Sequence, residues 1–264
     1  MSMKDITLGR YVYGTSVLHV LDPRTKLLSL FAVTAVLFTR NGWKALCLVG
    51  VYAGAACVLS GLKPSYLFRS LLPFKWLILM TICLNMVFVG GHILIEGPFP
   101  YGGITSEGLT YGLLYGSRIA LLVLLASILT LTTEPIVLVD GIEKLIAPLS
   151  KIRLKPHEIA TAMVITIRFI PILLDEAEKI RKSHIARGMR SEGGIGVKLK
   201  FISLLFMPLF HSAVRRADTL AVAMECRMYR SGIERTRYSK TTMTSRDWTA
   251  LAISCLLAFG TLTV

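Results

Sequence analysis

The chain has 264 residues, of which 53% are hydrophobic, and its mean hydropathy of +0.62 is too high for an ordinary soluble domain of this length. Its formal net charge is +14. Because no aromatic-basic stacking surface or RNA-binding motif accompanies this charge, we attribute it to membrane topology and to contact with anionic lipid, and we exclude nucleic acid as a partner.

Five apolar runs of about bilayer length predict membrane-spanning helices. The first and last runs are short, so they need tilt or local thinning of the bilayer to cross it. The residues before Leu27 have no apolar core, so we expect no cleaved signal peptide. The five runs are Leu27–Thr39, Ala45–Ser60, Trp76–Ile95, Leu109–Thr133 and Trp248–Val264.

The distribution of Lys and Arg predicts the orientation, because these residues are retained on the cytoplasmic side of short loops. An N-terminus inside places the basic segment 134–246 in the cytoplasm and the Glu96–Glu107 loop outside. We therefore expect a multi-pass membrane protein with its N-terminus in the cytoplasm; a bacterial-type cell membrane is the expected location. The predicted division is a cytoplasmic segment over 1–26, transmembrane helices 1 to 4 over 27–133, a cytoplasmic helical domain over 134–246 and transmembrane helix 5 over 247–264.

The segment 134–246 predicts one short and two long amphipathic helices, so the predicted fold class is an all-α membrane protein. The short helix covers Ile136–Leu149, and the long helices begin near Lys155 and Lys198. Pro171 and Pro208 fall inside the long helices and should kink them, and we expect the two kinked helices to cross. The apolar row of the first long helix is Ile159, Met163, Ile167, Ile170, Leu174 and Ala177, and that of the second is Ile202, Phe206, Leu209, Ala213, Ala217, Leu220 and Met224.

Each long helix closes on an arginine between two small or flexible residues. The first sequence is Ala186-Arg187-Gly188, in which the small residue permits close approach, the guanidinium offers a planar set of donors, and the glycine can stop the helix. The second is Cys226-Arg227-Met228, in which methionine replaces glycine, so the helix stop is open and Gly232 is the next candidate. The alternatives are solvated helix-end charges and long helices that lie on an anionic membrane surface.

Nothing in the sequence indicates catalysis or metal binding. The five cysteines and five histidines have no ligand spacing. The glycine-rich stretch Gly193–Lys200 lacks the Gly-Lys-Ser/Thr ending of a phosphate-binding loop, so we expect a non-enzymatic chain without a cofactor of its own. Arg118 and Asn85 lie inside predicted spans; a structural role for Arg118 is favoured over a substrate pathway, and Asn85 could bond across helices.

An ordered set of motifs resembles the transmembrane T component of energy-coupling factor transporters, which are ABC-type importers of vitamins and metal ions. The resemblance extends from about Gly9 to the last span. It is carried by Leu21-Asp22-Pro23-Arg24-Thr25-Lys26-Leu27, Arg168-Phe169-Ile170-Pro171, Ala186-Arg187-Gly188, Arg215-Arg216-Ala217-Asp218-Thr219-Leu220-Ala221, Ala223-Met224-Glu225-Cys226-Arg227-Met228-Tyr229 and Arg235-Thr236.

The resemblance implies a coupling subunit that links two cytoplasmic ATPases, which bind ATP and Mg²⁺, to a small substrate-binding membrane subunit. One such subunit would bind at a time, and several could be interchangeable. The implied ATPase-docking residues are Ala186, Arg187, Gly188, Cys226, Arg227 and Met228. The residues expected to contact the substrate-binding subunit are Ile159, Met163, Ile167, Ile170, Leu174, Ile202, Phe206, Leu209 and Leu220.

The alternative from a different class is a secondary transporter or channel that acts alone. Inverted hydropathy repeats with interrupted spans would favour it, and the sequence has none. An intramembrane enzyme is a weaker alternative, because no nucleophile, base or ligand pair stands out.

Overall fold

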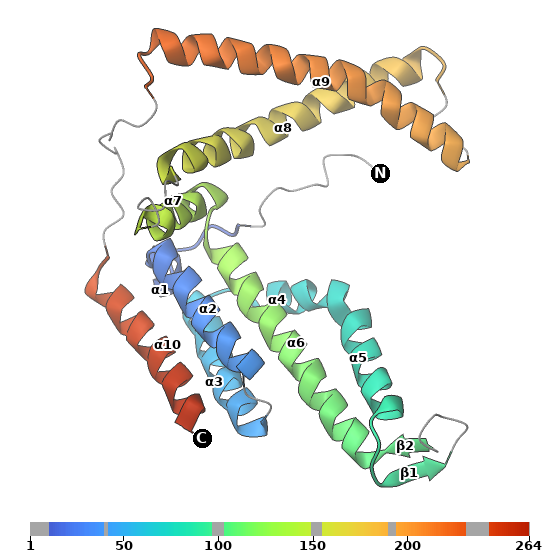
Figure 1. Ribbon diagram of the computed structural model, residues 1–264, viewed down its shortest axis with the longest axis vertical. Helices are drawn as coiled ribbons and strands as arrows, with labels where there is room; N and C mark the ends of the chain where they lie inside the picture. Colours follow the sequence, from blue (N-terminus) through green and yellow to red (C-terminus); the bar gives the residue numbers. More distant parts are fainter. Residues whose placement is uncertain are drawn as a thin grey trace. The chain divides into compact units, whose positions relative to one another are not determined.

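The computed structural model describes residues 11–39, 42–96, 103–148, 155–189, 194–230 and 243–263, and these residues are mainly helical (Figure 1). In chain order the elements are α1 Val17–Val20, α2 Pro23–Thr39, α3 Trp43–Ser60, α4 Pro64–Leu71, the 3-10 helix η2 Leu72–Phe74, α5 Lys75–Phe88, β1 Ile93–Glu96, β2 Gly103–Thr105, α6 Ser106–Thr132, α7 Pro135–Ile146, α8 Pro156–Ala186, α9 Ile195–Cys226 and α10 Ser245–Thr263. The predicted class, an all-α membrane protein, is confirmed.

Four segments are long and apolar enough to cross a bilayer: α3, the stretch Pro64–Phe88, α6 and α8. The helices α2 and α10 match the predicted first and fifth spans but are not among these four: α2 has 17 residues, and α10 has 19 but is less apolar. Conversely, α8 was predicted to be cytoplasmic, but its length and composition would allow it to cross a bilayer. The prediction of five spans therefore stays a prediction.

The predicted span Trp76–Ile95 is wrong in its last part, and two short strands follow the helix. The helix α5 ends at Phe88, and β1 pairs antiparallel with β2, with Ile95 opposite Ile104. Gly90 and Gly91 separate the helix from the strand. Glycine disfavours a continued helix, although it leaves the mean hydropathy of the run nearly unchanged.

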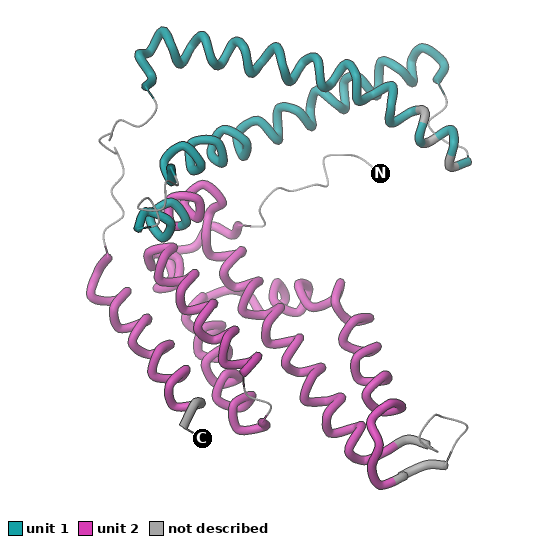
Figure 2. Tube along the Cα trace, in the orientation of Figure 1, with its two compact units in different colours: residues 1–8, 142–239 teal, residues 9–141, 240–264 magenta. Residues whose placement is uncertain are grey.

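The chain divides into two compact units, and the division falls within α7 (Figure 2). One unit comprises residues 9–141 and 240–264, and the other comprises residues 1–8 and 142–239. The short amphipathic helix was predicted over Ile136–Leu149; in the structure α7 begins one residue earlier and ends at Ile146, two residues before Pro148.

In the unit of residues 9–141 and 240–264 (unit 2 in Figure 2), α6 packs closely on α5 through glycines spaced four residues apart. A Cβ atom at Gly112 would lie 3.0 Å from the carbonyl oxygen of Ile82, and one at Gly116 would lie 2.9 Å from the Ile82 side chain. A Cβ at Gly108 would meet the backbone of Asn85. Small residues at this spacing let two helix backbones approach within a membrane, so the stripe determines how α5 and α6 pack.

A second contact region of this unit is a buried apolar cluster. Its members are Val33, Val36 and Leu37 of α2, Val49 and Ala53 of α3, and Leu125 of α6. The cluster holds α2 and α3 against α6, the longest helix of the unit.

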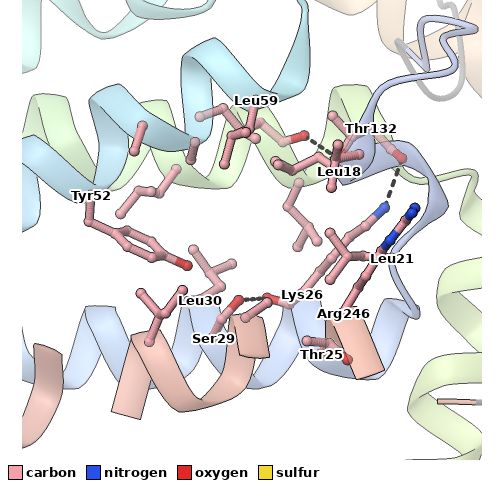
Figure 3. A pocket seen from close by; sticks show the side chains of 18 of the residues that line it. Leu18, Leu21, Thr25, Lys26, Ser29, Leu30, Tyr52, Leu59, Thr132 and Arg246 are labelled. Atoms are coloured by element: carbon pink, nitrogen blue, oxygen red, sulfur yellow. Dashed lines mark hydrogen bonds between the residues drawn. The ribbon is translucent and has the colours of Figure 1, made fainter. Parts of the chain in front are cut away.

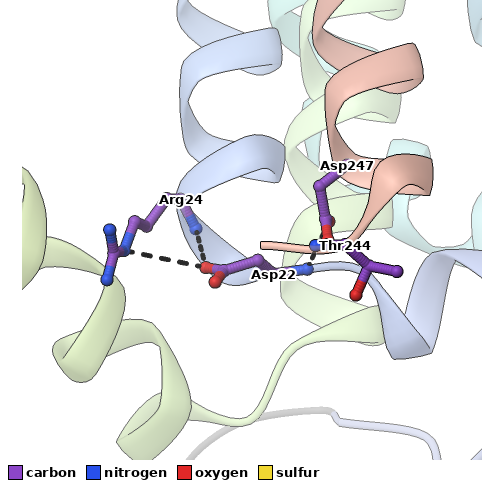
Figure 4. Close-up of polar contacts among 4 residues, drawn as sticks. All are labelled: Asp22, Arg24, Thr244 and Asp247. Atoms are coloured by element: carbon purple, nitrogen blue, oxygen red, sulfur yellow. Dashed lines mark hydrogen bonds and ion pairs between the residues drawn. The ribbon is translucent and has the colours of Figure 1, made fainter. Parts of the chain in front are cut away.

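Polar side chains join the starts of α2 and α10, which lie far apart in the sequence (Figure 4). The Asp22 carboxylate caps α2 by accepting a hydrogen bond from the Arg24 N–H at 3.0 Å. The Asp247 carboxylate accepts one bond from the Asp22 N–H and one from the Thr244 N–H, each at 2.8 Å. Part of the Leu21-to-Leu27 motif therefore has a structural role.

In the unit of residues 1–8 and 142–239 (unit 1 in Figure 2), α8 and α9 cross (Figure 1). An ion pair between Arg216 Nη2 and Glu176 Oε2, at 3.3 Å, joins them, and Ala177 is buried beside it. Both helices continue through their internal prolines, Pro171 and Pro208. The predicted crossing of the two long helices is observed.

We expect Gly112→Leu to destabilise the unit that contains α5 and α6, because its side chain must displace the α5 backbone, at a cost of about 1–3 kcal/mol. Gly54→Leu is the matched control, since a Cβ at Gly54 meets nothing within 4 Å. The measurement is the midpoint of thermal unfolding of the purified chain in detergent. Equal shifts in the two variants would contradict the close approach of α5 and α6.

Candidate functional site

The helix α8 ends in a turn that is closed by backbone hydrogen bonds, and Arg187 lies at this turn. Gly188 has a φ of 83°, in the left-handed region. Its N–H donates to the Ile185 carbonyl at 2.9 Å, and the Met189 N–H donates to the His184 carbonyl at 3.1 Å. These are the two bonds of a Schellman motif, with Arg187 as the capping residue.

The end of α9 repeats this arrangement without glycine. Met228 has a φ of 56°, its N–H donates to the Glu225 carbonyl at 2.8 Å, and the Tyr229 N–H donates to the Met224 carbonyl at 2.9 Å. The helix end that the sequence left open therefore lies at Cys226; Gly232, the other candidate stop, lies outside the described residues. A left-handed conformation costs a residue with a Cβ about 1–2 kcal/mol, and the two hydrogen bonds offset that cost.

The two ends are alike in exposure as well as in backbone. All six predicted docking residues are exposed: Ala186, Arg187, Gly188, Cys226, Arg227 and Met228. Within the described ranges, neither arginine side chain has an ion pair or a hydrogen bond. Each guanidinium can therefore offer its full set of donors to another molecule.

The ends are also placed symmetrically about the crossing. Arg187 follows Glu176 by eleven positions, and Arg227 follows Arg216 by eleven positions. At 1.5 Å per residue, each arginine lies about 16 Å along its helix from the ion pair. The two helices form a flat X, with the two carboxyl ends on its upper side and the two amino ends on its lower side (Figure 1).

The apolar rows lie mainly on the amino-terminal side of the crossing and are partly uncovered. Ile202 and Phe206 are 62% and 60% exposed, and Ile159 and Met163 are also exposed. The other members predicted to contact a partner are half-buried: Ile167, Ile170, Leu174, Leu209 and Leu220.

Exposed apolar side chains on α9 are not confined to the predicted row. Met207 is 70% exposed, and Phe210 is exposed and stacks on Phe206 with ring centroids 5.9 Å apart. The row interpretation missed these residues because it followed a single face, although the absence of charge from Phe201 to Phe210 was visible in the sequence.

The two polar residues inside the predicted spans make local contacts. Asn85 donates to the Thr81 carbonyl of its own helix at 2.8 Å, so the suggested bond across helices is not observed. The guanidinium of Arg118 lies 5.5 Å from the Tyr115 ring centroid, which is a cation-π contact. This contact favours the structural role predicted for Arg118.

The backbone account of the helix stops makes a testable prediction. Met228→Gly should stabilise the end of α9 by about 1 kcal/mol, and Gly188→Ala should destabilise the end of α8 by a similar amount, because only glycine adopts a positive φ at no cost. Hydrogen exchange of the last-turn amides measures both effects.

The control for this prediction is Gly196→Ala in the first turn of α9. A Cβ meets nothing within 4 Å at Gly188 or at Gly196, but only Gly188 has a positive φ. Gly196→Ala should therefore stabilise its helix. The same sign of effect at both positions would refute the assignment of Gly188 as a conformational stop.

Comparison with known proteins identifies the family of this chain. The family model described as CbiQ, cobalt transport protein, matches residues 14–239. The energy-coupling factor transporter transmembrane protein EcfT of Thermosediminibacter oceani is 41% identical over 262 residues, which cover 98% of each chain. The EcfT proteins of Bacillus subtilis and Clostridium kluyveri are 39% and 40% identical and cover 97% of this chain, over 97% and 95% of their own lengths. The chain therefore belongs to the CbiQ family of energy-coupling factor transporter transmembrane proteins, the T components.

Proposed function

We propose that this chain couples two cytoplasmic ATPases to a small substrate-binding membrane subunit during the uptake of a vitamin or another micronutrient. The observation that carries this proposal is the pair of matched helix ends, each with an exposed arginine at a Schellman stop. A chain that acted alone as a channel or secondary transporter would have no need for two such ends.

Each end has the properties of a docking element. The left-handed residue turns the chain away from the helix axis, so that the arginine occupies the corner. The small side chain before it, Ala186 or Cys226, lets the helix end approach a groove closely. The guanidinium then donates to carboxylates or carbonyls of the partner. ATP and Mg²⁺ would be bound by the ATPases and not by this chain.

The crossing of α8 and α9 can transmit motion between partners. When ATP draws the two ATPases together, the docked arginine ends move with them. Because packing and the Arg216–Glu176 pair hold the helices at their crossing, the apolar halves on the other side must move as well. These halves would contact the substrate-binding subunit, one such subunit at a time.

The proposed orientation follows the positive-inside rule, with the N-terminus and residues 134–246 in the cytoplasm and the Glu96–Glu107 loop outside. This orientation places both arginine ends on the side where ATP is available. The chain would then be a multi-pass subunit of a bacterial-type cell membrane.

Charge reversal at both ends tests the docking proposal. We expect the double variant Arg187→Glu/Arg227→Glu to reduce co-purification of the ATPases at least tenfold, because an unpaired or repelled interface charge costs about 2 kcal/mol or more. The chain should still insert in the membrane. Arg215→Glu is the control, because Arg215 is exposed and contacts only His211 of its own helix among the interactions described for its side chain. Undiminished recovery of ATPases with the double variant would exclude these residues as the docking groups.

Charges in the apolar rows test the other contact. Met163→Glu combined with Phe206→Glu should release the substrate-binding subunit and abolish transport while the ATPases stay bound, since burying an unpaired charge is costly. Thr219→Glu, at an exposed position of α9 away from the apolar row, is the control. Transport that persists with both apolar positions charged would mean that the rows do not form this interface.

A further inference from the structure

The unit that contains α2, α3, α6 and α10 has an open cavity that the proposed coupling role does not use. Its volume is about 470 Å³, which lies within the range of small-molecule sites. Apolar side chains of α1, α2, α3, α6 and α10 form most of its wall (Figure 3). Tyr52 lies at one end, and Lys26 and Arg246 lie together at the other (Figure 3).

Lys26 is a buried cation without a carboxylate in contact. It is 9% exposed, and its Nζ donates to the Thr132 carbonyl and the Thr133 hydroxyl, each at 3.0 Å. An ammonium group has three donors, and no carboxylate of the described residues lies within 4.0 Å of this one. The nearby Asp22 and Asp247 carboxylates accept backbone N–H groups instead. Both carboxylates interact with the ammonium electrostatically without touching it. Its third N–H has no partner among the described residues, so it can donate to an anionic oxygen in the cavity.

Arg246 adds a second cation at the same end. It is exposed at the second residue of α10, and within the described residues its guanidinium has no ion pair. The start of α2, the end of α6 and the start of α10 meet here, and helix ends of spanning segments lie at the level of lipid headgroups. The cavity thus combines an apolar body with a cationic end at headgroup level.

We propose that this cavity binds one phospholipid with an anionic headgroup. An acyl chain would lie along the apolar wall toward Tyr52, and the phosphate would accept hydrogen bonds from Lys26 and Arg246. A zwitterionic lipid would pack against the same apolar wall, but the cation of its headgroup would lie close to Lys26 and Arg246 and repel them. An apolar segment of a partner protein would supply no charge for the two cations, so the charge arrangement favours an anionic lipid.

The test uses the full-length chain in detergent with equal amounts of phosphatidylglycerol and phosphatidylcholine that have identical acyl chains. Native mass spectrometry counts the lipids that remain bound. We expect one retained lipid, with phosphatidylglycerol preferred. Arg246→Gln should lower that preference about fivefold, in line with the contribution of one cation near an anionic headgroup. Lys63→Gln removes the same charge from an exposed position outside the cavity and should change nothing.

A third variant fills the cavity. Ala250→Phe, on the α10 wall, should lower retention of both lipids, provided that its unfolding midpoint matches the wild type; if it does not, Arg246→Gln decides alone. Equal retention of the two lipids by the wild type, or equal effects of Arg246→Gln and Lys63→Gln, would overturn the proposal. If the Ala250→Phe variant still holds lipid but no longer binds a partner subunit, the cavity is the site of a protein segment. This outcome would overturn the proposal as well.

Discussion

The last carbonyl groups of an α-helix need donors, and at α8 and α9 the donors are the N–H groups of the two residues that follow the capping arginine. This requirement fixes the chain direction after each helix, and it leaves the arginine side chain at the corner. Because Gly188 and Met228 satisfy it in the same way, the two ends have the same backbone geometry despite their different residues. The docking proposal depends on this geometry more than on the identity of the neighbouring side chains.

The crossing of α8 and α9 links the movement of one arginine end to the movement of the other. The Arg216–Glu176 pair lies on partly exposed side chains, so by itself it contributes little stability. The pair marks the point where the helices meet. The arginine ends lie on one side of this point, and the apolar rows lie mainly on the other. In the other unit, the spaced glycines of α6 and the polar contacts between the starts of α2 and α10 hold the spanning helices together.

The sequence predicted the elements well where local chemistry decides them. The first long helix was predicted to begin near Lys155 and to stop at Gly188; α8 begins at Pro156, and Gly188 follows its capping residue, so both predictions are confirmed. Met228 was not predicted as a stop, because the left-handed region favours glycine and the compensating hydrogen bonds are visible only in three dimensions. The stripe of Gly108, Gly112 and Gly116 was available in the sequence and was overlooked. The environment of Lys26 could not be predicted, since it depends on contacts with residues more than one hundred positions away.

The most direct test of the coupling account is a distance measurement in the assembled transporter. Spin labels at Ser183 and Ala223, in a chain without its native cysteines, report the separation of the arginine ends, and labels at Thr166 and Ser203 report the apolar halves. Pulsed electron resonance with and without ATP gives both distances. The account predicts that both distances change when ATP binds. A change between the arginine ends with no change between the apolar halves would contradict it.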